Sequence, residues 1–130
     1  MDPLSGGLAA SAILFGFLFT GFWWSLDREL KFEPAERHFK PSYALLIIST
    51  ACVGYFGLVA PLREAARVVP SLINTYRGVS LGLIAVLGYM LTEYAHYSIF
   101  QRPKYTTRFE WIFSVATVAI LVAAALALFT

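Results

Sequence analysis

The sequence has little charge and a single cysteine, and both scarcities limit what the protein can be. Charged residues make up 14% of the 130 residues and hydrophobic residues 58%, whereas soluble domains have about 25% and about 45–50%. A soluble fold of this length could not bury so much apolar surface. The net charge of +2 is small, so we expect no nucleic-acid partner. One cysteine, Cys52, excludes an intramolecular disulfide, and we expect it to be a small buried residue.

Instead, the chain contains four long apolar runs, at residues 7–26, 42–62, 78–99 and 111–129. At about 1.5 Å per residue, about 20 helical residues cross the roughly 30 Å hydrocarbon core of a bilayer. Trp23 and Trp24 close the first run, where indole rings favour the membrane interface. We therefore predict an all-α fold: one membrane domain over residues 1–130, built as a four-transmembrane-helix bundle with short charged loops.

The basic residues are distributed unevenly over the connections between these runs. Seven of the ten Lys and Arg residues lie in residues 27–41 and 100–110, and the other three follow the second run. Cytoplasmic loops of membrane proteins carry the excess of Lys and Arg. We therefore expect a multi-pass integral membrane protein with loops 27–41 and 100–110 in the cytoplasm and both termini on the other side.

Residues 63–69 fit either a short interfacial helix or a plain loop.

The third run contains an acid, Glu93, and a histidine, His96. On a helix over residues 78–99, Glu93 would lie about 7 Å from the bilayer centre, where an acidic side chain costs about 2.5–3.5 kcal/mol. Tyr89, Thr92 and Tyr97 are close to Glu93 on such a helix and complete a polar stripe. Such a stripe predicts an ion, proton or interhelical polar site.

Three interpretations of this stripe are open. Glu93 and His96 could form a proton or cation site, because imidazole exchanges protons near neutral pH. The stripe could instead hydrogen-bond to another helix, or Glu93 could extend to the interface. The Glu93-x-x-His96 spacing also occurs in di-iron bundles, but the other runs lack the further acids that such a site needs. We predict no cofactor and no metal site, with haem or metal ligation by His96 as the alternative.

Small residues mark the second and third runs. Gly78, Gly82 and Gly88 lie in the third, and Gly54 and Gly57 in the second. Glycines allow helix backbones to approach closely in a membrane. We therefore predict that these five positions are helix-packing sites.

These features favour a structural or accessory subunit of a multi-subunit membrane complex over an enzyme. The expected partners are the lipid bilayer and other membrane subunits or copies of the chain itself. The alternative is a small oligomeric transporter or channel, coupled to an ion or proton through Glu93 and His96. We predict no catalytic residues, because no nucleophile elbow or phosphate-binding glycine loop is present.

Overall fold

The computed structural model describes residues 3–33, 36–97, 99–100 and 106–129, and in these residues all regular structure is helical. The elements are α1 (Pro3–Leu30), α2 (Pro41–Cys52), η2 (Val53–Val59), α3 (Ala60–Val68), η3 (Pro70–Leu72), α4 (Ile73–His96) and α5 (Thr106–Phe129). Within the described chain, four helical stretches are long and apolar enough to cross a membrane: Pro3–Leu30, Pro41–Val68, Pro70–His96 and Arg108–Phe129. The predicted all-α fold with four membrane-spanning helices is confirmed.

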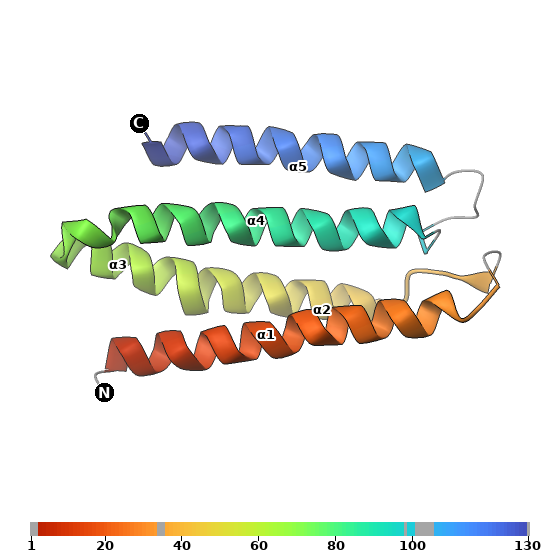
Figure 1. Ribbon diagram of the computed structural model, residues 1–130, viewed down its shortest axis with the longest axis horizontal. Coiled ribbons are helices and arrows are strands. Elements are labelled where there is room, and N and C mark those ends of the chain that lie inside the picture. The colour runs from red at the N-terminus through yellow and green to blue at the C-terminus, as the bar shows by residue number, and fades with distance from the viewer. Residues whose placement is uncertain (1–2, 34–35, 98, 101–105, 130) are drawn as a thin grey trace.

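Consecutive spans lie antiparallel and side by side (Figure 1). Helix α5 packs along α4, α4 packs on the α2–η2–α3 helix, and that helix packs on α1. The start of α1 and the end of α5 lie at the same end of the bundle as the turn between α3 and α4, and we call this the terminal end (Figure 1). At the other end, called the loop end, α1 is connected to α2 and α4 to α5.

The second span is one continuous helix with an unusual middle. Its central segment η2 is a π-helix, in which the backbone N–H of Ala60 bonds to the carbonyl of Tyr55 five residues earlier. This wide turn comes directly before Pro61, whose ring would clash with the carbonyl of Gly57 in a regular α-helix. Of residues 63–69, for which a helix and a loop were both open, 63–68 belong to α3 and continue the second span, and Val69 follows its end in an extended conformation.

The best-packed part of the bundle is at the loop end. Its core consists of Phe22, Leu26, Tyr43, Met90, Tyr94 and Ile99. Helix α5 has no buried residue among those described and exposes large apolar side chains over most of its length. Such a helix is suited to lipid or to a partner helix. Cys52, expected to be buried, is instead exposed on the helix surface.

Candidate functional site

A buried carboxylate, Glu29, lies in the last turn of α1. It follows Phe22 and Leu26 at seven and three residues, so the three side chains share one face of the helix. All three are at most 1% exposed. The packing that buries the two apolar residues therefore also brings the carboxylate of Glu29 into the interior.

The Glu29 carboxylate has donors on both oxygens. The Tyr43 hydroxyl donates to Oε2 at 3.0 Å, and the backbone N–H of His38 donates to Oε1 at 3.1 Å. The Lys40 ammonium is 3.6 Å from Oε2. A buried charge is stable only when it is paired and hydrogen-bonded in this way. The network connects α1, the first loop and the start of α2.

Aromatic rings enclose this network. Tyr94 of α4 stacks on Tyr43, with ring centroids 5.1 Å apart. The rings of Phe22 and Phe39 meet Tyr94 edge-on at 5.3 and 5.4 Å. The Tyr94 hydroxyl is buried and has no hydrogen-bond partner among the described residues. The Glu29 carboxylate is thus surrounded mainly by aromatic rings, with few other polar atoms beside it.

Arg37 fixes the first loop to two helix ends. Its guanidinium donates to the carbonyls of Leu30 at 3.0 Å, Phe32 at 3.1 Å and Tyr97 at 3.1 Å. Carbonyls at the C-terminus of a helix have no partner within the helix. Arg37 therefore satisfies acceptors at the ends of both α1 and α4.

The sequence did not predict this network, because Glu29 lies in residues 27–41, which were expected to form a charged loop. Glu29 is two residues from Asp27 in the chain, yet the Asp27 side chain is 70% exposed and that of Glu29 is 1% exposed. The helical register of Phe22, Leu26 and Glu29 was the available signal. This register becomes visible only when the first helix is extended beyond residue 26, through the charged residues, to Leu30.

Glu93, the residue that the sequence singled out, lies near the loop end of α4. Helix α4 runs from Ile73 to His96, so Glu93 is about 13 Å from its midpoint at about 1.5 Å per residue. This places it near the edge of a roughly 30 Å hydrocarbon core, because α4 begins and ends earlier than the predicted run 78–99. Its side chain is half-buried and makes no hydrogen bond or ion pair with a described residue.

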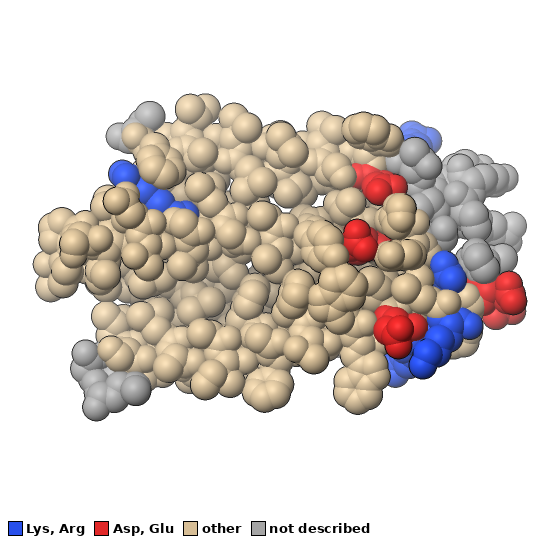
Figure 2. Space-filling view, viewed as in Figure 1, with Lys and Arg blue, Asp and Glu red and all other residues tan. Residues whose placement is uncertain are grey.

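His96 is paired with an acid from the next helix. Its Nδ1 is 3.0 Å from Oε1 of Glu110, at the start of α5. The ring of Tyr97 lies edge-on to His96 at 4.9 Å. Among the described residues, no group of three or more His, Cys, Asp and Glu side chains could hold a metal ion. The pair therefore joins two helices at the loop end, where charged side chains gather (Figure 2).

The remaining stripe residues have different surroundings. Tyr89 is 40% exposed and packs against Trp23 of α1, with centroids 5.9 Å apart. Thr92 and Tyr97 are half-buried. Tyr89, Glu93 and His96 thus lie on a partly exposed side of α4, with Tyr89 packed against α1 and His96 paired with α5.

The five predicted packing glycines divide into two groups. A Cβ at Gly54 would be 3.2 Å from Leu83, and at Gly57 and Gly88 it would overlap Ser11 and Thr117. These three glycines lie at contacts between helices of the chain. A Cβ at Gly78 or Gly82 would meet nothing within 4 Å.

The two open glycines belong to a continuous outer surface of α4. Spacings of three and four residues place its members on one face of the helix. We call this surface the α4 outer face: Gly78, Gly82, Ala85, Tyr89, Glu93 and His96. All are exposed except the half-buried Glu93.

No protein-family model, curated protein or solved structure matches this chain.

Proposed function

We propose that the protein is a structural or accessory subunit of a multi-subunit membrane complex and that it binds a transmembrane helix of another subunit through the α4 outer face. The observation that carries this proposal is the open space at Gly78 and Gly82, on the same face as a carboxylate without a described partner, Glu93. One end of this face offers close backbone approach and the other a polar contact.

The small residues supply the packing part of the interaction. Helices in a bilayer gain no hydrophobic energy by associating, because lipid tails are as apolar as their side chains. Association depends on close packing and on interhelical hydrogen bonds. Gly78, Gly82 and Ala85 present a flat surface that a partner backbone can approach. Gly88, in contrast, already contacts Thr117 of α5 within the chain.

Glu93 defines the chemistry of the partner. An acidic side chain near the edge of the hydrocarbon core is stabilised by a hydrogen-bond donor or a cation. A second copy related by a two-fold axis along the membrane normal would place two Glu93 carboxylates at the same depth, and like charges facing each other oppose association. We therefore propose a different subunit that contributes Lys, Arg or a hydroxyl at this level.

We also propose an orientation in which the loop end is cytoplasmic and both termini lie on the opposite side. The support is the seven Lys and Arg residues in loops 27–41 and 100–110, against three in the rest of the chain. Labelling an affinity tag on either terminus with a membrane-impermeant reagent in intact cells tests this. If the tag is labelled only after the membrane is permeabilised, the termini are cytoplasmic and the proposed orientation is wrong.

The main test is gentle extraction of the tagged protein from its own membrane, followed by native mass spectrometry. We expect different subunits in fixed stoichiometry. Gly82→Leu should reduce their recovery about tenfold or more, as should Glu93→Ala, because each removes at least about 1.4 kcal/mol of association energy. The matched control is Gly16→Leu on α1, where a Cβ also meets nothing within 4 Å.

Two results would contradict the proposal. The first is a protein that emerges alone, as a monomer or homo-oligomer. The second is equal recovery of partners with Gly82→Leu and Gly16→Leu. Flux across proteoliposomes containing only this chain, abolished by Glu93→Gln, would establish the transporter alternative instead.

A further inference from the structure

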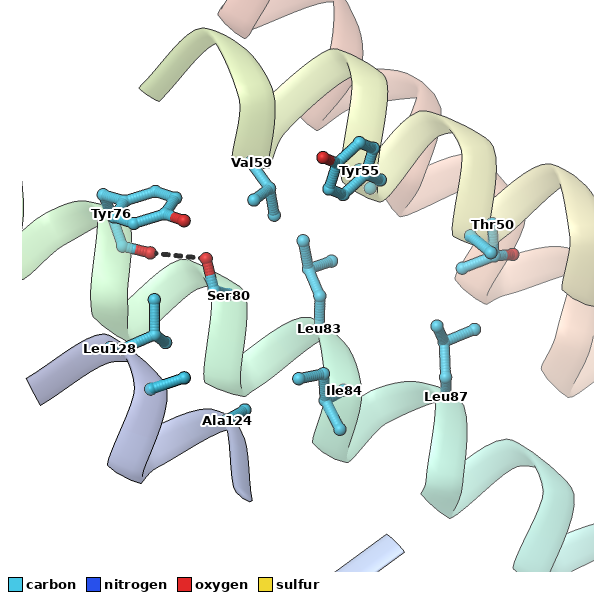
Figure 3. A pocket seen from close by; sticks show the side chains of 13 residues that line it. Thr50, Tyr55, Val59, Tyr76, Ser80, Leu83, Ile84, Leu87, Ala124 and Leu128 are labelled. Carbon is cyan, nitrogen blue, oxygen red and sulfur yellow. Dashed lines mark hydrogen bonds between the residues drawn. The ribbon is translucent and has the colours of Figure 1, made fainter. Parts of the chain in front are cut away.

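A cavity of about 390 Å³ lies between the second span, α4 and the last turns of α5. Figure 3 shows side chains that line it, including Tyr55, Tyr76, Ser80, Leu83 and Ala124. Its α4 residues are offset by two positions from those of the α4 outer face, which corresponds to about 200° around a helix. The cavity is thus a separate feature on the other side of α4.

We propose that this cavity binds one acyl chain of an anionic phospholipid, with the phosphate of the headgroup at Arg77. The proposal is independent of the partner subunit proposed above, because it concerns the opposite face of α4 and the terminal end of the bundle.

The lining of the cavity suits hydrocarbon. The Ser80 hydroxyl donates to the Tyr76 carbonyl and the Thr50 hydroxyl to the Leu46 carbonyl, both at 2.8 Å. These two hydroxyls therefore satisfy their hydrogen-bond donors within their own helices. Apolar cavities exclude water and accept apolar guests, and about 390 Å³ lies within the range of about 300–1,000 Å³ for ligand sites.

The shape of the cavity suits a chain that enters from the membrane surface. Along α4 it extends from Tyr76, one turn from the start of the helix, to Leu87. These eleven positions span about 16 Å at about 1.5 Å per residue, about half of the hydrocarbon core. Tyr55 and Ala127 line it and are exposed, so the cavity is open to the surrounding lipid.

The charges at the terminal end favour an anionic headgroup. Described charged residues there are Arg63, Glu64, Arg67 and Arg77, an excess of two positive charges. Glu64 pairs with Arg67 at 3.5 Å, which leaves Arg63 and Arg77 without an acidic partner among the described residues. A basic patch lies at this end, away from the other charges on this face of the molecule (Figure 2).

Arg77 is placed to bind a phosphate beside the cavity. It follows Tyr76 in the chain, and its guanidinium lies over the Phe129 ring, with Cζ 4.6 Å from the centroid. One terminal nitrogen is 3.5 Å from Asn74 Oδ1, and the buried Nε has no partner in the described structure. A guanidinium can donate two parallel hydrogen bonds to one phosphate.

The test measures lipid binding to delipidated protein in detergent micelles by native mass spectrometry. The probes are palmitoyl-oleoyl phosphatidylglycerol and phosphatidylcholine, which have the same chains and differ in headgroup charge. We expect phosphatidylglycerol to bind about tenfold more tightly. Arg77→Gln should remove most of this preference, whereas Arg108→Gln at the loop end should leave it intact. Free glycerol phosphate should not compete, because it lacks the acyl chain.

A second pair of variants tests the acyl-chain site. Ala124→Phe fills the cavity and should abolish the tight binding event, whereas the neighbouring exposed Ala123→Phe should preserve it. Equal binding of the two lipids, or an equal loss of preference with Arg77→Gln and Arg108→Gln, would overturn the proposal. Unchanged binding to Ala124→Phe would also overturn it. If Ala124→Phe does not fold, the comparison of Arg77→Gln with Arg108→Gln tests the proposal by itself.

Discussion

The rings of Tyr43 and Tyr94 stack with centroids 5.1 Å apart and planes 16° apart, but only one of their hydroxyls has a hydrogen-bond partner among the described residues. Tyr43 donates to Glu29 at 3.0 Å, whereas the Tyr94 hydroxyl is buried and has no partner among the described residues. The two stacked rings therefore differ in the hydrogen bonding of their hydroxyls.

Replacing either tyrosine by phenylalanine should reveal this difference. Tyr43→Phe removes a hydrogen bond to a charged acceptor and should lower the free energy of unfolding by about 1.5–3 kcal/mol. Tyr94→Phe removes a buried, unpaired hydroxyl and should leave the stability unchanged or raise it by about 1 kcal/mol. Denaturant unfolding in micelles, followed by circular dichroism, measures both. Equal destabilisation by the two changes would show that Tyr94 has an acceptor.

Glu29→Ala should be among the most destabilising single changes in the first span. It leaves the Tyr43 hydroxyl, the His38 N–H and Lys40 without their acceptor. A buried donor left unsatisfied costs about 1–3 kcal/mol, whereas Lys40 is 31% exposed and can be hydrated. The control is Asp27→Ala, whose 3.8 Å pair with Lys31 is largely exposed and contributes about 0–1 kcal/mol. The same unfolding assay compares them. Equal stability of the two variants would show that the Glu29 network contributes no more than the exposed Asp27–Lys31 pair.

The contrast between Asp27 and Glu29 also shows how far sequence reasoning can go. Hydropathy locates the four spans, because a bilayer requires about 20 apolar residues regardless of their neighbours. It cannot decide which member of a charged cluster is buried. That depends on the first loop folding back so that Lys40 and the His38 N–H reach the Glu29 carboxylate.

The candidate site was only partly accessible from the sequence for a similar reason. Spacing along one helix placed Tyr89, Glu93 and His96 on a common face, since that relationship is local. The partner of His96 is Glu110, fourteen residues away on the next helix, and no local pattern predicts that contact. Likewise, sequence spacing does not distinguish Gly88, where an added Cβ would overlap Thr117, from Gly78, where an added Cβ would meet nothing within 4 Å.

Arg37→Lys should loosen the first loop although the charge is retained. An ammonium group cannot reproduce the planar fork that reaches the carbonyls of Leu30, Phe32 and Tyr97. We expect faster amide hydrogen exchange at residues 31–40 and at the end of α4, measured by mass spectrometry. The matched control is Arg67→Lys, an exposed residue paired with Glu64. Unchanged exchange at both helix ends would contradict the role assigned to Arg37.

Gly88 and Gly78 offer the sharpest separation of contacts within the chain from contacts with a partner. A methyl group at Gly88 would lie 2.7 Å from Thr117 Cβ, and Thr117 is held by its own hydrogen bond to the Phe113 carbonyl at 2.7 Å. Because Thr117 cannot turn away without losing that bond, Gly88→Ala should displace α5 and destabilise the isolated protein by about 1–3 kcal/mol.

At Gly78 the same substitution enters open space. It should leave the stability of the isolated chain unchanged or raise it by up to about 1 kcal/mol, the helix-propensity difference between Gly and Ala. If the α4 outer face packs against another subunit, however, the added methyl group should reduce recovery of that subunit. Thermal unfolding and partner recovery are measured on both variants. Gly88→Ala should lower the stability of the isolated protein, whereas Gly78→Ala should keep that stability and lower partner recovery. A Gly78→Ala protein that binds its partners as well as the wild type would show that contact at this end of α4 is not close, and would confine any interface to the region of Glu93.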